Sequence, residues 1–269
     1  MLPLLSLLAV VVCSLVLVSY INHIQEKRNE KRLKVRTLKM RVSELEELAI
    51  SISTLIETPM IAKLINDEAI SLLQEIRQTD PKLTYIASSL QAAEIRSNKL
   101  IDIDSDDIAI NRVMQSDAQI NRAKKALEAS GAALRSLYNK GDISRQELET
   151  FLQELSWQRL QVEALSLVAQ GHRCMQRQDV LKAYTFYKKA QQHLISHQHT
   201  DTRRHDQIKQ LSEMLSNQRT TLSVDLMPET QYNPPPREQV APPTEEELEE
   251  AMAQGEGEMP SAEDFLSQG

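Results

Sequence analysis

The chain has 269 residues, 6 glycines and 4% aromatic residues, and this composition favours an all-α protein because helices accept its Leu, Ala, Gln, Glu, Lys and Arg more readily than strands do. Eleven acids and one base follow residue 226, so the tail carries most of the net charge of -7 and the remaining residues sum to about +3, which excludes the clustered basic face of a nucleic-acid-binding protein. The 2 cysteines, Cys13 and Cys174, exclude a disulfide framework.

The first predicted element is a single-pass transmembrane anchor over residues 1–24. Residues 2–21 carry no charged side chain, and about 20 residues at 1.5 Å per residue cover a bilayer core of about 30 Å. Eight bases follow between Lys27 and Arg41, and the positive-inside rule then predicts a cytoplasmic body. The sequence therefore predicts a membrane partner and a bacterial inner-membrane location, with a buried core helix as the alternative.

Residues 25–57 are expected to form a basic juxtamembrane helix with coiled-coil spacing. Leu38, Leu45 and Ile52 recur at intervals of seven, and Leu48 and Leu55 are offset from them by three. This apolar seam predicts either self-association into a homo-oligomer or an amphipathic helix packed on the body.

Residues 58–225 are predicted to form a helical body. Pro59 begins a helix that reaches about Asp80, a second helix follows over residues 82–100, and a third is expected over residues 107–139. Gly141 is suited to end the third helix, and Ser144 with Glu147 has the spacing of a capping box that starts a fourth. The short connections predict antiparallel neighbours, as in a bundle or a set of helical hairpins.

Within the body, residues 164–195 resemble a single tetratricopeptide repeat. The likeness is carried by small and aromatic residues at the packing positions of two helices, namely Gly171, Ala183, Tyr187 and Ala190. Leu167, Cys174 and Ile195 depart from the pattern of that family, and a generic helical hairpin is the alternative. The resemblance implies a protein-binding groove rather than an active site.

No arrangement of residues in the sequence predicts catalysis, a cofactor or a metal. His193, His197, His199 and His205 invite a zinc hypothesis, but no fourth ligand accompanies them and we expect solvated histidines. Asp102–Asp107 resembles the start of a calcium loop, but Asp107 stands where a glycine is needed and Val113 where a glutamate is needed, so a polar loop is expected. We predict that the chain is not an enzyme, with an enzyme of unrecognised type as the least favoured alternative.

Residues 226–269 are predicted to be a disordered acidic tail, because their prolines and acids cannot bury enough apolar surface. Thr244 can cap a short helix. The tail is interpreted as a solubilising segment, as a segment that folds onto the basic helix, or as a recognition segment with apolar contacts at Leu248, Met252, Phe265 and Leu266.

Together these features predict a membrane-anchored cytoplasmic helical scaffold or adaptor that binds another protein. A self-associating structural spacer of the membrane is the alternative.

Overall fold

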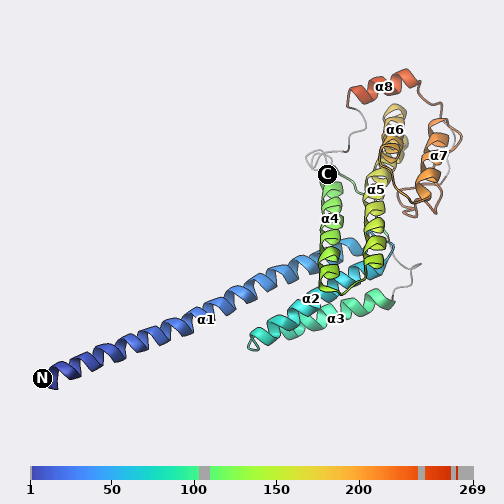
Figure 1. Cartoon of the computed structure of the whole chain (residues 1–269). Coiled ribbons are helices and arrows are strands. Elements are labelled where there is room, and N and C mark those ends of the chain that lie inside the picture. The colour runs from blue at the N-terminus through green and yellow to red at the C-terminus, as the bar shows by residue number, and fades with distance from the viewer. Residues whose placement is uncertain (1, 103–109, 236–239, 256–258, 260–269) are drawn as a thin grey trace. The chain divides into compact units, whose positions relative to one another are not determined.

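The computed structural model describes the whole chain except residues 1, 103–109, 236–239, 256–258 and 260–269, and it describes no side chains for residues 2–18 and 102. The described residues form eight α-helices and no strands, which confirms the all-α prediction (Figure 1). In chain order the helices are α1 (Leu2–Ser53), α2 (Pro59–Thr79), α3 (Tyr85–Asp102), α4 (Asp117–Lys140), α5 (Arg145–Gln176), α6 (Val180–Ser196), α7 (Arg203–Leu215) and α8 (Glu245–Ala253).

The chain divides into two compact units. The first unit comprises residues 1–47 and 66–99, and the second comprises residues 48–65 and 100–269. Helices α1 and α2 therefore each contribute one end to each unit. The acids and bases of the candidate site described below all belong to the second unit.

The first unit is held by a small apolar core from three helices. Its members come in pairs spaced by one or two helical turns, Val35 and Val42 on α1, Leu73 and Ile76 on α2, and Ile86 and Ala93 on α3. A buried polar contact reinforces this core, since the Asn66 amide donates to the Ala93 carbonyl at 2.9 Å and accepts from Arg96 at 2.7 Å.

The apolar seam over residues 38–55 is covered by the chain itself. Leu45, Ile52 and Leu55 are all buried, and Leu38 packs against the core of the first unit. The seam therefore serves as the buried face of an amphipathic helix, one of the two alternatives that its spacing allows.

The predicted transmembrane anchor is wrong. Most of residues 1–24 lie where no side chains are described, and among the residues that are described no helix is long and apolar enough to cross a membrane. The described side chains of α1 begin at residue 19, and from Glu26 onward they include charged groups at short intervals, such as Lys27, Arg28 and Glu30. The predicted single-pass location in a bacterial inner membrane depended on this anchor and is therefore also wrong.

The second unit is built on two successive helical hairpins, α4–α5 and α5–α6 (Figure 1). Gly141 ends α4 in the left-handed conformation with φ 86°, and Ser144 and Glu147 form the predicted capping box that begins α5. Helix α4 begins at Asp117 instead of residue 107, because Ser116 caps it and residues 110–116 run as an extended segment beside α5. The Ser166 hydroxyl accepts from the Met114 backbone N–H at 2.8 Å and helps to hold this segment.

Where the sequence predicts disorder over residues 226–269, the described part of this tail makes defined contacts with the second unit. Met227 is fully buried, and the Glu229 carboxylate accepts from the Arg112 side chain at 2.9 Å and from its backbone N–H at 3.1 Å. Farther along, the predicted cap Thr244 begins α8, which packs on α6 through Leu248. A segment poor in apolar residues can be held in place when one of its carboxylates pairs with a buried cation such as Arg112. Phe265 and Leu266 lie outside the described residues.

Candidate binding groove and internal cavity

The α5–α6 hairpin is closed by a glycine that faces a tyrosine ring. A Cβ atom on Gly171 would lie 2.3 Å from Cε1 of Tyr187, so only glycine fits this helix position. Nδ1 of His172 lies 2.9 Å from the Tyr187 hydroxyl, which fixes the ring in this place. Ala183 and Ala190 on α6 are fully buried. The four residues that carry the resemblance thus all lie in buried positions of the hairpin.

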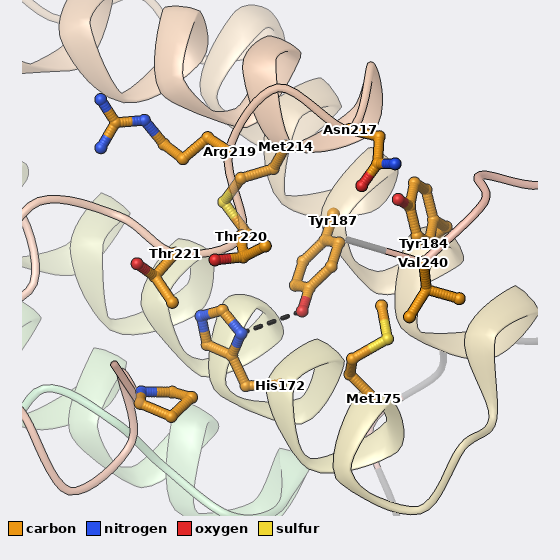
Figure 2. Close-up of a pocket in the computed structure, with 11 residues that line it drawn as sticks. His172, Met175, Tyr184, Tyr187, Met214, Asn217, Arg219, Thr220, Thr221 and Val240 are labelled. Atoms are coloured by element: carbon orange, nitrogen blue, oxygen red, sulfur yellow. Dashed lines mark hydrogen bonds between the residues drawn. The ribbon is translucent and has the colours of Figure 1, made fainter. Parts of the chain in front are cut away.

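One side of this hairpin borders a partly open cavity of about 120 Å³. Figure 2 shows the His172 ring and the Tyr187 hydroxyl meeting at its wall, with Met175, Tyr184 and Val240 close by. Helix α7 and the segment after it complete the lining with Met214, Asn217, Arg219, Thr220 and Thr221, together with Pro234. Burial raises the pKa of the Tyr184 hydroxyl, so this phenol stays protonated at neutral pH.

The lining places the His172–Tyr187 pair beside apolar side chains such as Met175 and Met214 and beside polar ones. The polar side chains are Asn217, Arg219, Thr220 and Thr221. The cavity has room for a small molecule or several waters, since one water needs only about 10–15 Å³ measured in this way.

A longer groove lies along α5, between α4 and α6. It consists of two hollows of about 590 and 410 Å³, and both are lined by Lys124, Glu163, His193 and Ser196. The first hollow adds Asp117, Ile120, Asn121, Leu167, Lys189, Gln192 and Met259. The second adds Ser156, Arg159, Leu160, His197, Gln198 and His199. Because the hollows share four side chains, they adjoin each other, and we call the two together the α5 groove.

Charged side chains cross the middle of the α5 groove. The Lys124 ammonium donates to Glu163 at 2.6 Å, and Nδ1 of His193 lies 3.4 Å from the same carboxylate. Burial alone would raise the pKa of Glu163, but the Lys124 hydrogen bond and the nearby cationic groups outweigh it and lower the pKa. Burial lowers the pKa of His193, against the opposing charge of Glu163. The Lys124–Glu163 ion pair therefore crosses the groove, with the His193 ring beside it.

The histidines of residues 193–205 do not converge. His193 and His197 stack with ring centroids 4.4 Å apart, whereas His199 packs on Trp157 at 5.3 Å. Within the part of the chain that the structure describes, no group of three or more His, Cys, Asp or Glu side chains could hold a metal ion. The acidic run at residues 102–107 lies outside the described side chains.

The tail contributes one side chain to the groove. Met259 is buried, and it lines the first hollow together with Ile120 on α4 and Lys189 on α6. Helix α8 packs beside it, because Gln192 lines both the first hollow and the contact between α6 and α8.

No protein-family model, curated protein or solved structure matches the chain. The functional argument therefore rests on the geometry of the cavity and the groove. Sequence reasoning found the hairpin but missed the groove, and above all Lys124, Glu163 and Met259. The polar stripe Asp117, Asn121 and Lys124 on α4 was the available signal, since three- and four-residue spacing places these side chains on one helix face.

Proposed function

We propose that the chain is a helical scaffold or adaptor that binds a segment of another protein in the α5 groove. The observation that carries the proposal is a pair of adjoining hollows lined by three packed helices. From Leu167 back to Ser156 the groove follows 11 residues of α5, or about 16 Å at 1.5 Å per residue. About five residues of extended peptide, or three turns of helix, span that length.

The lining suits recognition of a protein segment. Ile120, Leu160 and Leu167 supply an apolar floor, and the charged groups at the rim can orient a ligand. Protein partners commonly insert a few large apolar side chains into such hollows and surround them with polar contacts. The structure offers rigid walls for this, because α5 packs against both α4 and α6.

The self-associating spacer is the less favoured function. It depended on an available seam at Leu45, Ile52 and Leu55, and these side chains are buried within the chain. Charged substitutions there would disturb the fold itself, so they cannot report on oligomers alone.

The test places a photo-crosslinking amino acid in the full-length protein in its own cells. Position 156 lies in the second hollow, and position 129 on α4 is exposed and lies outside both hollows. We expect a discrete heterologous adduct from position 156 and none from position 129. Filling the groove with Ser196→Trp should abolish that adduct, whereas Ala129→Trp should leave it unchanged. Equal adducts from both positions, or an adduct that survives Ser196→Trp, would refute binding in the groove.

A further inference from the structure

The cavity beside the α5–α6 hairpin is a separate site from the α5 groove. The cavity and the two hollows of the groove share no lining side chain. Helix α6 divides its surface between them, since Tyr184 and Tyr187 line the cavity whereas Lys189 and His193 line the groove. A function of the cavity therefore goes beyond the protein binding proposed for the groove.

Aromatic rings and thioethers form much of the cavity wall. The buried rings of Tyr184 and Tyr187 meet edge to face with centroids 6.0 Å apart, and the His172 ring meets Tyr187 in the same way at 5.4 Å. Met175 and Met214 add sulfur atoms beside these rings (Figure 2). Aromatic edges and polarisable sulfur both make favourable contacts with a further ring. The wall therefore suits a flat, apolar molecule.

The size of the cavity limits that molecule to one ring. A cavity of about 150 Å³ with apolar walls holds one benzene molecule, and this cavity of about 120 Å³ is slightly smaller but partly open. Apolar atoms make up most of the surface that its lining exposes, so water inside would make few hydrogen bonds with the walls. A ring that displaces such water gains affinity.

A carboxamide at the end of α7 supplies a polar contact. Asn217 lies two residues beyond Leu215 in the left-handed conformation with φ 58°, and its backbone N–H donates to the Met214 carbonyl at 3.1 Å. Figure 2 shows its side chain turned toward Tyr184 and Tyr187. Among the described residues no group forms a hydrogen bond with this carboxamide, so it can pair with a ligand hydroxyl as donor or acceptor.

The charge of the lining favours a neutral ligand. Arg219 is the one permanently charged residue in the lining, and its Nε donates to Glu213 at 3.0 Å. The arginine is thus already neutralised by an acid of the same segment. An anionic ligand would have to compete with Glu213 for it.

From these observations we propose that the cavity binds one small neutral aromatic alcohol of the phenol class, with its ring against Tyr184 and Tyr187 and its hydroxyl at Asn217. A ligand of about eight non-hydrogen atoms in such a site should bind with a Kd of about 0.1–1 mM. One neutral hydrogen bond changes the affinity about fivefold.

The experiment measures binding of 4-fluorophenol and fluorobenzene to the full-length protein by fluorine NMR of the ligands. We expect saturable binding of 4-fluorophenol to the unaltered chain. Asn217→Gly keeps the left-handed backbone and removes the carboxamide, so it should weaken 4-fluorophenol about fivefold and leave fluorobenzene within about twofold.

The matched control is Gln178→Gly. Gln178 is the other non-glycine residue with a positive φ in the described part of the chain, at 65°, and it lies outside the cavity lining. This control should leave the affinities of both ligands unchanged. No saturable binding of 4-fluorophenol, or equal losses for the two ligands in Asn217→Gly, would overturn the proposal.

Two further arms test the place and the charge of the ligand. Filling the cavity with Met175→Trp should abolish binding of both ligands, whereas Met60→Trp, at an exposed methionine outside the cavity, should not. Binding that survives Met175→Trp would refute the cavity as the site, and if that variant does not fold, the Asn217→Gly comparison still decides. 4-Fluorobenzoate should bind at least about tenfold more weakly than 4-fluorophenol, and tighter binding would show an anion site at Arg219 and overturn the neutral class.

Discussion

Replacing Gly171 by alanine tests the packing on which the α5–α6 hairpin depends. The new Cβ would lie 2.3 Å from Cε1 and 2.7 Å from Cδ1 of Tyr187, and that ring is buried and bonded to His172. Overpacking of this kind costs about 1–3 kcal/mol, and the short distances place Gly171→Ala at the upper end. Alanine returns about 1 kcal/mol through its higher helix propensity, so we expect a net loss of about 2 kcal/mol in the free energy of unfolding.

The measurement is guanidinium unfolding followed by circular dichroism at 222 nm, with Gly131→Ala as the matched control. A Cβ on Gly131, also inside a helix, would lie 3.3 Å from the flexible end of Leu152 and at ordinary contact distances from Arg135 and Leu155. Here the helix propensity gain should offset the slight crowding, so the unfolding midpoint should stay or rise. If Gly171→Ala unfolds at the same denaturant concentration as Gly131→Ala, the close approach of the two helices is wrong. In a Tyr187→Leu background, most of the Gly171→Ala loss should disappear.

Three other predictions follow from the second unit. Glu229→Gln should lower the free energy of unfolding by about 2 kcal/mol, because it removes the charge of one of the two carboxylates that pair with the buried Arg112 guanidinium, the other being Glu57 at 3.3 Å. Limited proteolysis should then cut within residues 226–235, and an unchanged cleavage pattern would contradict the ordered tail. Ser144→Ala should lower the free energy of unfolding by about 1 kcal/mol, because it removes the side chain that accepts a hydrogen bond from the first turn of α5. The same unfolding assay measures this loss, and an unchanged free energy would argue against the capping box. Burial lowers the pKa of His193 in the folded chain, so the unfolded chain takes up a proton at this histidine first as the pH falls below 6.5. The free energy of unfolding should therefore drop between pH 7.5 and 5.5, and the drop should be smaller in His193→Gln. Equal drops in both chains would show that His193 does not cause the pH dependence.

Much of the local structure could be predicted because its causes lie within a few residues of each other. The capping box needs only Ser144 and Glu147, three residues apart, and the end of α4 needs only the freedom of Gly141 to adopt a positive φ. The start of α4 was predicted ten residues too early, since helical spacing continues through residues 110–116. That segment is instead extended beside α5, where Ser166 binds it from 52 residues away.

The candidate site could be predicted only in part. Gly171 and Tyr187 were identified as packing residues, and the structure places the ring of one directly over the α-carbon of the other. The α5 groove was missed because its walls come from three helices, and Lys124 meets Glu163 across 39 residues of sequence. No spacing rule connects such positions.

By itself the sequence determined that the chain is helical, where several of its helices begin and end, and which hairpin contains the tight glycine contact. These follow from backbone preferences and short-range spacing, which act before the chain is compact. Only the tertiary structure decided that the seam around Leu45 is covered from within, that Glu229 is ordered by Arg112, and that Met259 lies in the α5 groove. These outcomes depend on burial and on charges brought together from distant parts of the chain. Composition alone does not determine which carboxylate pairs with a given buried cation.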